Sequence, residues 1–451
     1  MNTIVALATP PGRGAIGVIR ISGPGSLSIT QSLVSDHQSC LQRSRLVLKS
    51  IRDPSTREVI DRALISFFQS PHSFTGEDVV EISCHGSPVV LRQVIDLILE
   101  LGARVATPGE FTLRALMNGR LNLSEAEAIR DLIDAQTDAA AKQAVRQLGG
   151  ELSLRLQPLK QDLVSLIVPL ESALEFVEDD LPQVQGDRLD ADLKKLISEI
   201  EILSSTYGQG HLLRDGVKVT LVGPPNSGKS SLFNSLLGVE RAIVTEIPGT
   251  TRDTLTEFVS INGVPIALTD TAGVRESAER IESIGIERTR AAMADADLLL
   301  IVIDGSADLT DSERAFLRST ESKRAIALNK SDLPTFRDRL RCEVDDQMKV
   351  IAVSAKTRLG LDDLRAAILE PFNLSESHNS GLLITNARHY DLLTRARKEL
   401  ESARQHFKNR TSEELILVGM HNALRFLGDI SGETTTEEML SEIFSTFCIG
   451  K

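Results

Sequence analysis

The sequence has few cysteines and no long apolar run. Its four cysteines, Cys40, Cys84, Cys342 and Cys448, form no Cys-x-x-Cys pair, which excludes a disulfide framework and a cysteine-based zinc cage. We expect free thiols. The longest purely apolar run, Leu298 to Ile303, is far shorter than the roughly 20 residues that cross a bilayer.

The N-terminal residues also lack the basic stretch that precedes the apolar core of a secretory signal. We therefore expect a cytoplasmic protein. Lys and Arg together number 50 against 63 Asp and Glu, a formal charge of −13, which argues against non-specific coating of nucleic acid or anionic lipid. A chain of 451 residues predicts roughly three domains at about 150 residues each.

The pattern of the first 118 residues predicts a mixed α/β segment. Residues 16–21 and 62–68 are typical of strands, and residues 87–101 begin with a Ser-Pro pair that is typical of a helix start. Long helical periodicity follows from about Leu123, where Ser124-Glu-Ala-Glu127 predicts a capping box. Three prolines in this helical stretch, Pro158, Pro169 and Pro182, are expected to bend or divide it.

Strand and helix patterns then alternate from Val217 to about Leu369. Asn262-Gly263 is a tight-hairpin signal, so the second and third strands of this segment should be antiparallel neighbours. Helical periodicity returns from Asn386 to Phe447, which suggests an α/β module inserted into a helical domain. The six predicted strands are Val217–Val222, Leu255–Ile261, Pro265–Thr269, Leu298–Ile303, Ala325–Leu328 and Lys349–Val353.

The first of these strands leads into Gly223-Pro-Pro-Asn-Ser-Gly-Lys-Ser230, and a helical pattern follows. This context predicts a phosphate-binding loop. Its glycines let backbone N–H groups surround phosphate oxygens, and the helix N-terminus adds partial positive charge. Lys229 supplies a full positive charge, and Ser230 is the predicted Mg²⁺ ligand.

Three more motifs follow in the order typical of translation-factor-like GTPases. Asp270-Thr-Ala-Gly273 offers a carboxylate to the metal side and an N–H to the γ-phosphate. Asn329-Lys-Ser-Asp332 ends in a carboxylate that can accept both N–H donors of the guanine edge, a pattern that adenine lacks. Ser354-Ala-Lys356 is expected to complete the base pocket.

Thr250-Thr-Arg-Asp253 lies where these GTPases carry a switch threonine, and Thr251 is the predicted second Mg²⁺ ligand. Arg252 is either an in-cis arginine finger or a salt-bridge partner of the switch. Ala272 and Val274 leave no glutamine to orient the attacking water, so another group must do so.

The chain as a whole resembles the MnmE/TrmE family of tRNA modification GTPases. The resemblance rests on Ala8-Thr-Pro-Pro-Gly-Arg-Gly14, Ser73-Phe-Thr-Gly-Glu-Asp78, Pro108-Gly-Glu-Phe111 and Cys448-Ile-Gly-Lys451, beside the GTPase motifs. It implies a multidomain α/β plus all-α protein with a Ras-like GTPase domain on a six-stranded mixed sheet. The implied domains are an N-terminal α/β dimerisation and folate domain (1–118), a helical domain in two segments (119–215 and 376–451) and an inserted GTPase domain (216–375).

The resemblance also implies a K⁺ ion in place of an arginine finger. Asn226 and the loop containing Thr245, Ile247 and Thr250 would hold it, and Glu282 would orient the water. A solvated helix charge is the alternative reading of Glu282. The predicted catalytic residues are thus Glu282, Lys229 and Thr251, and the predicted GTP-binding residues are Asn226, Ser227, Gly228, Lys229, Ser230, Ser231, Thr245, Thr250, Thr251, Asp270, Thr271, Ala272, Gly273, Asn329, Lys330, Asp332, Ser354, Ala355 and Lys356.

For the N-terminal domain the resemblance implies a tetrahydrofolate site formed by Arg20, Glu81, Arg120 and Lys451. A carboxylate suits the pterin edge, and cations suit the glutamate tail. Cys448 would serve tRNA modification. An apolar stripe of Leu440, Ile443, Phe444 and Phe447 predicts that the last helix docks rather than frays.

The implied function is K⁺-stimulated GTP hydrolysis by a homodimer that works with MnmG, an FAD-dependent flavoprotein. The pair would install a carboxymethylaminomethyl or aminomethyl group on carbon 5 of the wobble uridine of certain tRNAs, with carbon from 5,10-methylene-tetrahydrofolate. An Era- or EngA-like ribosome-assembly GTPase is the first alternative, but neither a KH-type Gly-x-x-Gly domain nor a second phosphate loop is found. A folate-dependent aminomethyltransferase without a flavoprotein partner is the second.

Overall fold

The structure is a computed structural model that describes residues 2–34, 45–175, 183–238, 255–270, 293–311, 313–314, 317, 323–338, 349–372 and 381–450. The chain folds into two compact units. The first combines Met1–Arg130 with Leu427–Lys451, and the second is Asp131–Phe426. The C-terminal residues therefore belong to the same unit as the N-terminal residues.

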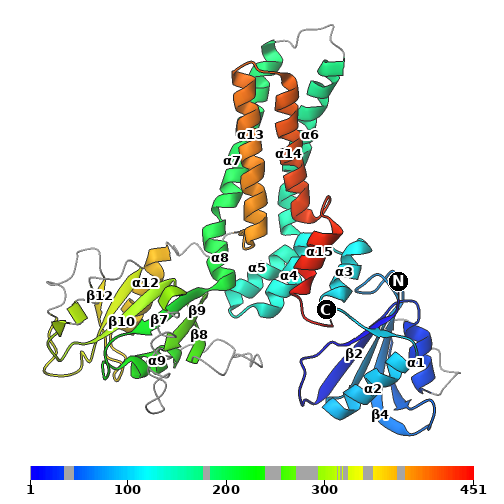
Figure 1. Ribbon diagram of the computed structural model, residues 1–451, viewed down its shortest axis with the longest axis horizontal. Coiled ribbons are helices and arrows are strands. Elements are labelled where there is room, and N and C mark those ends of the chain that lie inside the picture. Colours follow the sequence, from blue (N-terminus) through cyan, green and yellow to red (C-terminus); the bar gives the residue numbers. More distant parts are fainter. Residues whose placement is uncertain are drawn as a thin grey trace. The chain divides into compact units, whose positions relative to one another are not determined.

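The first unit is built on a mixed sheet (Figure 1). The strands β1 and β6 are parallel, and the other neighbours are antiparallel. The strands expected at 16–21 and 62–68 are confirmed as β2 and β4. In spatial order the sheet is β3 (Leu46–Arg52), β4 (Val59–Phe68), β5 (Val79–His85), β2 (Ile16–Ser22), β1 (Ile4–Leu7) and β6 (Arg104–Val105).

The helices α1 (Ser26–Val34) and α2 (Pro88–Glu100) pack against this sheet, and their apolar residues form a hydrophobic core with those of the strands. The predicted start of α2 is confirmed, because Ser87 is the N-cap and proline occupies the first turn. Leu91, Val94 and Ile98 follow at three- and four-residue spacing and are buried with the apolar residues of β1, β2, β4 and β5.

The last helix, α15 (Glu437–Ser445), lies in the first unit with α3 (Glu110–Met117) and with α4 (Leu123–Asp134) as far as Arg130. The rings of Phe444 and Phe447 are tilted by 46° with centroids 4.9 Å apart, and both residues are buried with Leu123 and Ala126. This confirms the predicted docking of the C-terminal helix.

The predicted cap of α4 is wrong by two residues. The side chain of Asn122 accepts a hydrogen bond from the Glu125 N–H, and the Glu125 carboxylate accepts one from the Asn122 N–H. This reciprocal pair is a capping box that starts at Asn122. Ser124 instead donates to the Asn122 side chain at 2.7 Å.

Long helices of the second unit stand side by side (Figure 1). Arg404 on α13 pairs with Asp190 on α7, and His421 on α14 contacts Glu171 on α6. Of the expected bend or division at the prolines, division is excluded at Pro158 and Pro169, because α6 continues through both, and Pro182 lies outside the described residues. The helices are α5 (Asp138–Leu148), α6 (Glu151–Glu175), α7 (Gln183–Ser205), α8 (Tyr207–Asp215), α13 (Ala387–Lys408) and α14 (Glu413–Ser431).

The second unit also contains the predicted α/β module. β8 and β9 are antiparallel and joined at Asn262 and Gly263, whose φ angles of 51° and 82° are those of a type I′ turn; the other pairs are parallel. All six predicted strands are confirmed within two residues. The spatial order is β12 (Val350–Ala352), β11 (Arg324–Asn329), β10 (Leu298–Asp304), β7 (Val217–Val222), β9 (Val264–Asp270) and β8 (Leu255–Ile261).

The helices α9 (Lys229–Leu237) and α12 (Leu361–Leu369) cover one face of this sheet. Alternate residues of β10 divide between the two faces, with Leu300 and Val302 in the core under α9 and α12, and Leu299 and Ile301 in a second core on the other face. The strands are buried on both faces, as parallel strands usually are.

The helix α8 connects directly to the first strand of this module. Only Gly216 separates the end of α8 at Asp215 from the start of β7 at Val217. On α8, Tyr207 stacks on Tyr390 of α13 with ring centroids 4.4 Å apart, and it also stacks on His211 at 5.4 Å. An aromatic stack thus joins the start of α8 to α13.

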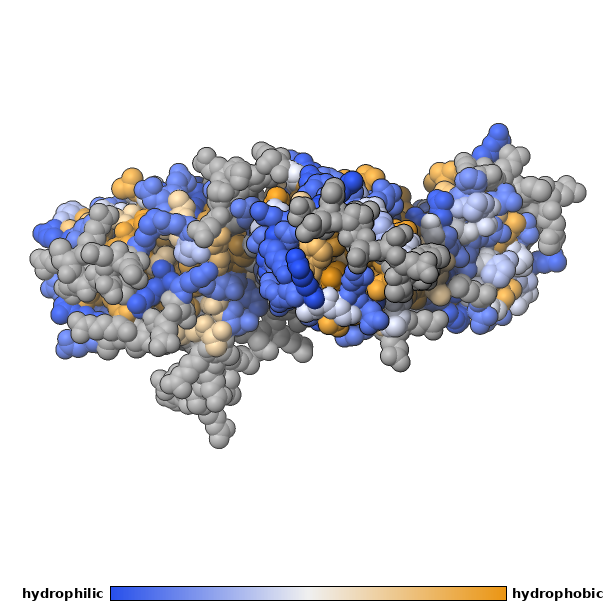
Figure 2. Space-filling model, turned by 90° about the horizontal axis from the view of Figure 1, so that it is seen from above, coloured by the Kyte–Doolittle hydropathy of each residue, from blue (hydrophilic) through white to orange (hydrophobic). Residues whose placement is uncertain are grey.

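Polar residues make up much of the face seen in Figure 2, with apolar side chains scattered among them. Within the part of the chain that the structure describes, no helix has both the length and the apolar character needed to span a membrane.

Candidate functional site

The loops that follow parallel strands of the second unit carry the predicted nucleotide-binding residues. The phosphate loop follows β7, Asp270 ends β9, Asn329 ends β11, and Ser354 follows β12. Because the carboxyl ends of parallel strands lie at one edge of a sheet, the fold brings these motifs together.

The phosphate loop ends in a glycine that no other residue can replace without a clash. Gly228 is the N-cap of α9 with φ of 92°, and a Cβ at this position would lie 2.3 Å from the Asn329 side-chain nitrogen. Asn226 also has a positive φ, 63°. The loop therefore turns its backbone N–H groups and the N-terminus of α9 toward a common point, as phosphate binding requires.

Lys229 is nearly buried, with 8% of its surface exposed. Its ammonium donates to the carbonyl oxygens of Gly223 at 3.0 Å and Pro224 at 2.8 Å. Both acceptors belong to the phosphate loop, so the positive charge is held over the loop, where phosphate oxygens would meet it.

Ser230, which follows Lys229, and Asp270 form a pair of oxygen donors that suits a metal ion. The Ser230 hydroxyl donates to the Asp270 carboxylate at 2.9 Å, and Asp270 is 4% exposed. Hydroxyl and carboxylate oxygens are the donors that Mg²⁺ prefers. Among the described residues there is no cluster of three or more His, Cys, Asp or Glu that could hold a metal ion.

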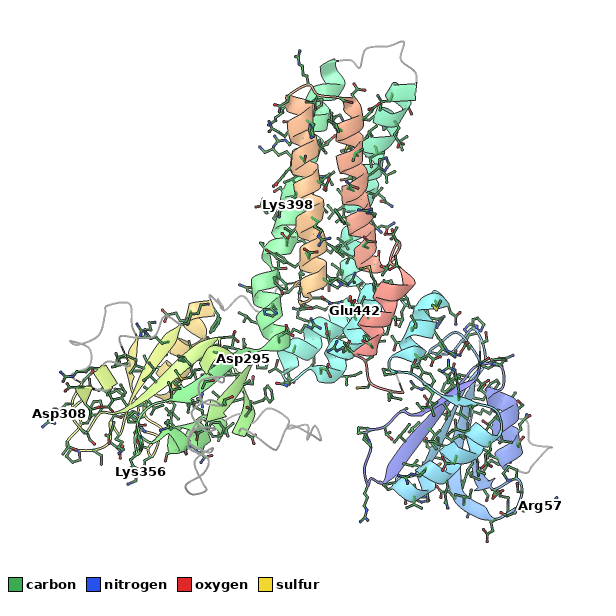
Figure 3. All side chains as sticks on the ribbon, viewed as in Figure 1. Arg57, Asp295, Asp308, Lys356, Lys398 and Glu442 are labelled. Atoms are coloured by element: carbon green, nitrogen blue, oxygen red, sulfur yellow. The ribbon has the colours of Figure 1, made fainter. Side chains whose placement is uncertain are left out.

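The base-pocket motifs are connected by Asn329, which is 2% exposed. Its amide nitrogen donates to the Ser227 carbonyl at 2.9 Å, and its oxygen accepts from the Ala355 N–H at 3.1 Å. The hydroxyl of Ser354 donates to Asp332 at 2.7 Å. The side chain of Lys356 is exposed at the edge of this module (Figure 3).

Lys330 joins two adjacent strand ends. Its ammonium lies 2.6 Å from the carboxylate of Asp304, the last residue of β10. Burial alone would raise the pKa of Asp304, but hydrogen bonds from Lys330 and Ser306 hold it below its ordinary value. Lys330 therefore links the base-pocket motif to the end of β10. The Asn-Lys-Ser-Asp motif alone does not predict this contact.

Several predicted residues lie outside the described part of the chain. They are Thr245, Ile247, Thr250, Thr251, Thr271, Ala272, Gly273, Glu282 and Lys451.

The first unit brings Arg20 and Glu81 together. They are direct cross-strand neighbours on β2 and β5, and the guanidinium lies 2.7 Å from the carboxylate. The guanidinium also lies 5.5 Å from the ring centre of Phe74 and 5.9 Å from that of Phe111. Arg120 lies against Gly76, in the loop that also carries Phe74, because a Cβ at Gly76 would lie 3.3 Å from the Arg120 Cγ.

The tail carrying Cys448 is attached to this unit. The Cys448 carbonyl accepts a hydrogen bond from the Gly109 N–H at 3.3 Å, and a Cβ at Gly450 would lie 2.4 Å from the Leu7 carbonyl oxygen. The cysteine itself is exposed. Its thiol is therefore accessible at an ordered position.

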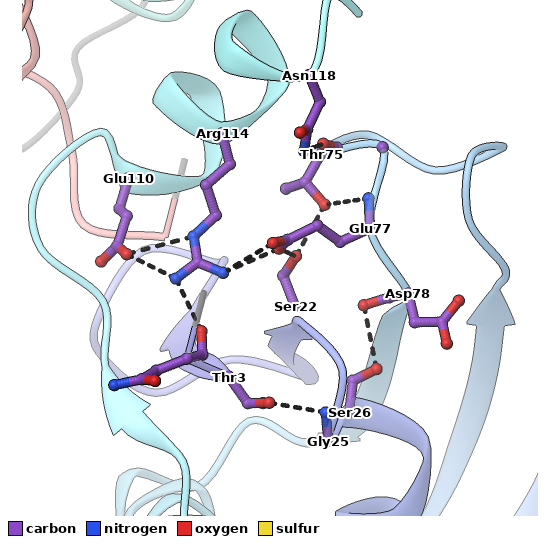
Figure 4. A network of polar contacts seen from close by, with 12 residues as sticks. Thr3, Ser22, Gly25, Ser26, Thr75, Glu77, Asp78, Glu110, Arg114 and Asn118 are labelled. Carbon is purple, nitrogen blue, oxygen red and sulfur yellow. Dashed lines mark hydrogen bonds and ion pairs between the residues drawn. The ribbon is translucent and has the colours of Figure 1, made fainter.

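A buried polar network around Arg114 was not predicted from the sequence (Figure 4). Arg114, whose side chain is 4% exposed, binds the carboxylates of both Glu77 and Glu110. Burial alone would raise the pKa of Glu110, but hydrogen bonds from Arg104, the Thr107 N–H and Arg114 lower it to about 2. The two glutamates belong to the motifs at 73–78 and 108–111, which the sequence analysis used only to recognise the family.

Two family models together match nearly the whole chain. The model described as "GTP-binding protein TrmE N-terminus" matches residues 3–120, and "MnmE helical domain" matches residues 123–448. The chain belongs to the MnmE family. The match confirms both the recognition of the family and the predicted fold class.

Relatives of the MnmE family align over the full length. The tRNA modification GTPase MnmE of Koribacter versatilis is 43% identical, covering 100% of this chain and 99% of that protein, and the one of Aquifex aeolicus is 41% identical with 99% of each covered. The G domain of the T. maritima FeoB iron transporter is 29% identical over 34% of this chain and 97% of that one, but its TM-score of 0.27 is too low to support an argument. Membership of the MnmE family confirms the prediction of a GTP-hydrolysing enzyme.

Proposed function

We propose that this protein is a K⁺-stimulated GTPase that modifies carbon 5 of the wobble uridine of certain tRNAs together with the flavoprotein MnmG. The added group is a carboxymethylaminomethyl or aminomethyl group whose carbon comes from 5,10-methylene-tetrahydrofolate. The observation that carries the proposal is the full-length similarity to tRNA modification GTPases. The nucleotide loops and the Arg20–Glu81 pair support it.

In this proposal the chain's own residues bind and orient GTP. Lys229 binds phosphate oxygens, Asp332 accepts the guanine N–H groups, and Ser230 with Thr251 holds Mg²⁺. A K⁺ ion at Asn226 and the 245–250 loop supplies the positive charge that an arginine finger supplies elsewhere. Glu282 orients the attacking water.

For the folate, the proposal uses the adjacent charges of the first unit. Glu81 meets the amide and amidine edge of the pterin, and Arg20, Arg120 and Lys451 meet the negatively charged tail. Cys448 acts in tRNA modification. The proposed assembly is a cytoplasmic homodimer with MnmG and tRNA, and the division of the chain into the domains 1–118, 119–215, 216–375 and 376–451 belongs to the same proposal.

The decisive experiment is modified-nucleoside analysis of tRNA from a strain that lacks this protein. We expect the modified wobble uridine to disappear and to return when the unchanged gene is restored. Restoring an Asp332→Asn variant tests whether guanine recognition is needed. An unchanged wobble uridine in the deletion strain would overturn the proposal and favour the ribosome-assembly alternative.

The K⁺ requirement predicts that GTP turnover is faster in K⁺ than in Na⁺ at equal ionic strength. The physical reason is that the smaller Na⁺ does not fit a site built for K⁺, so the charge that develops between the β- and γ-phosphates stays uncompensated. Steady-state phosphate release measures both rates. Equal rates would contradict the K⁺ site and point back to Arg252.

A further inference from the structure

We propose that Arg114 is a positioning residue for reduced-folate binding and that it acts by holding the 73–78 loop and the start of α3 against Arg20. This inference rests on the folate site proposed above. It concerns residues outside that site, since Arg114, Glu77 and Glu110 are not among its ligands.

Arg114 connects two segments far apart in the sequence. One terminal nitrogen donates to Glu77 at 2.9 Å, and the other donates to Glu110 at 2.8 Å and to the Asn2 carbonyl at 2.9 Å. Its side chain is 4% exposed. A buried guanidinium that shares two carboxylates is held firmly, because loss of either contact would leave a charge without compensation.

Each connected segment places an aromatic ring against Arg20. Phe74 lies three residues before Glu77, and Phe111 directly follows Glu110. Their ring centres lie 5.5 and 5.9 Å from the Arg20 guanidinium. Two rings at these distances restrict the guanidinium, so that it faces Glu81 in a fixed direction.

The same loop also supports Arg120. The Asn118 amide donates to the Thr75 carbonyl at 2.7 Å, and Gly76 lies against the aliphatic part of Arg120. The hydroxyl groups of Ser22 and Thr75, together with Glu77, complete the attachment of the loop to β2 (Figure 4). The Arg114 contacts thus determine the spacing between the two cations proposed to bind the folate tail.

Arg104 offers a matched control. It also binds Glu110, with one nitrogen at 2.8 Å, but its side chain is 46% exposed and no bond from it to the 73–78 loop occurs among the described contacts. A change at Arg104 therefore disturbs Glu110 without releasing Glu77. Lysine at either position keeps the charge but loses the planar fork that serves several acceptors.

The experiment measures the Kd of 5-formyltetrahydrofolate by calorimetry on full-length protein, with protection of the α2 amides from hydrogen exchange as a check that the first unit is folded. We expect Arg114→Lys to raise the Kd at least about tenfold and Arg104→Lys to change it less than about twofold, since one lost charged hydrogen bond corresponds to about tenfold. If Arg114→Lys does not fold, Glu77→Gln tests the same contact with the same expectation.

A double variant separates positioning from general stability. In a Phe74→Leu background, we expect Arg114→Lys to cause a smaller loss of folate affinity than in the unchanged protein, because the loop already lacks its ring and only the support of Phe111 remains to be lost, while the losses of thermal stability still add. Additive losses of affinity, or an unchanged Kd in a folded Arg114→Lys protein, would overturn the inference. Failure of the unchanged protein to bind the folate would instead overturn the proposed folate site and, with it, this role of Arg114.

Discussion

At the scale of single residues, base selectivity depends on Asp332. We predict that Asp332→Asn raises the Kd for GTP by at least about 100-fold, because the amide cannot accept hydrogen bonds from both guanine donors and one donor is left unpaired. The affinity for xanthosine triphosphate should rise, since xanthine presents a carbonyl where guanine has its amino group. Calorimetric titration with both nucleotides measures this exchange.

The control is Asp362→Asn on α12, where the side chain is 96% exposed. It should leave both affinities unchanged. A variant at Asp332 that still prefers GTP would contradict the assigned role.

Glu110 predicts a pH dependence of stability in the first unit. Its pKa lies near 2 in the folded protein, below the ordinary 4.5, so its contribution is complete above about pH 4.5 and is lost as the pH falls toward 2. A shift of this size corresponds to about 3 kcal/mol. We predict that Glu110→Gln lowers the free energy of local unfolding at pH 7 and that the difference from the unchanged protein shrinks as the pH falls below 4.5.

Hydrogen exchange of the α3 amides at pH 7 and at pH 3.5 measures that difference. Glu100→Gln, at an exposed position on α2, serves as the control and should have little effect at either pH. A difference in exchange between Glu110→Gln and the unchanged protein that is equal at both pH values would contradict the low pKa of Glu110.

At the scale of elements, the attachment of α15 depends on its buried aromatic face. Phe444 is 2% exposed, and truncation of a buried phenylalanine costs about 3–5 kcal/mol. We predict that Phe444→Ala releases α15 and the tail, so that the amides from Glu437 to Gly450 exchange faster. Met439→Ala, at a position that is 49% exposed, should not, and equal protection in both variants would contradict the docking.

All six strands of the α/β module, but only β2 and β4 of the first sheet, are predicted from the sequence, because their side-chain pattern is local. The β10 residues form a continuous apolar run because both faces of that strand are buried, and Asn262-Gly263 determines the β8–β9 turn by its own conformational preference. The cap of α4 shows the limit of such reasoning. Asn122 and Ser124 are both good cap residues, and only the packing of Leu123 into the core selects the first.

The Arg114 network lies beyond local reasoning for a different reason. Glu77 is 37 residues away in the sequence, so only the folded sheet brings the two charges together.

The motifs of the nucleotide site were predictable because each follows a parallel strand of one sheet. The support that Asn329 gives to Ser227 and Ala355 was not, since it depends on how neighbouring loops meet.

At the scale of the whole molecule, GTP hydrolysis and the cysteine tail belong to different units. The phosphate loop lies in Asp131–Phe426, and Cys448 lies with the N-terminal residues. We therefore predict that Cys448→Ser keeps near-normal GTP turnover but abolishes tRNA modification. Phosphate release and nucleoside analysis of the complemented deletion strain measure the two activities, and full modification would show that the thiol has no role.

The stacked rings of Tyr207 and Tyr390 have a practical consequence. The chain contains two tyrosines and no tryptophan, so its ultraviolet emission comes from this single pair. Tyr207 lies on α8, the helix that precedes β7, and Tyr390 lies on α13. Stacked phenols quench one another, and the signal depends on their separation. The unlabelled protein therefore carries an optical reporter at the contact between α13 and α8, the helix that leads into β7.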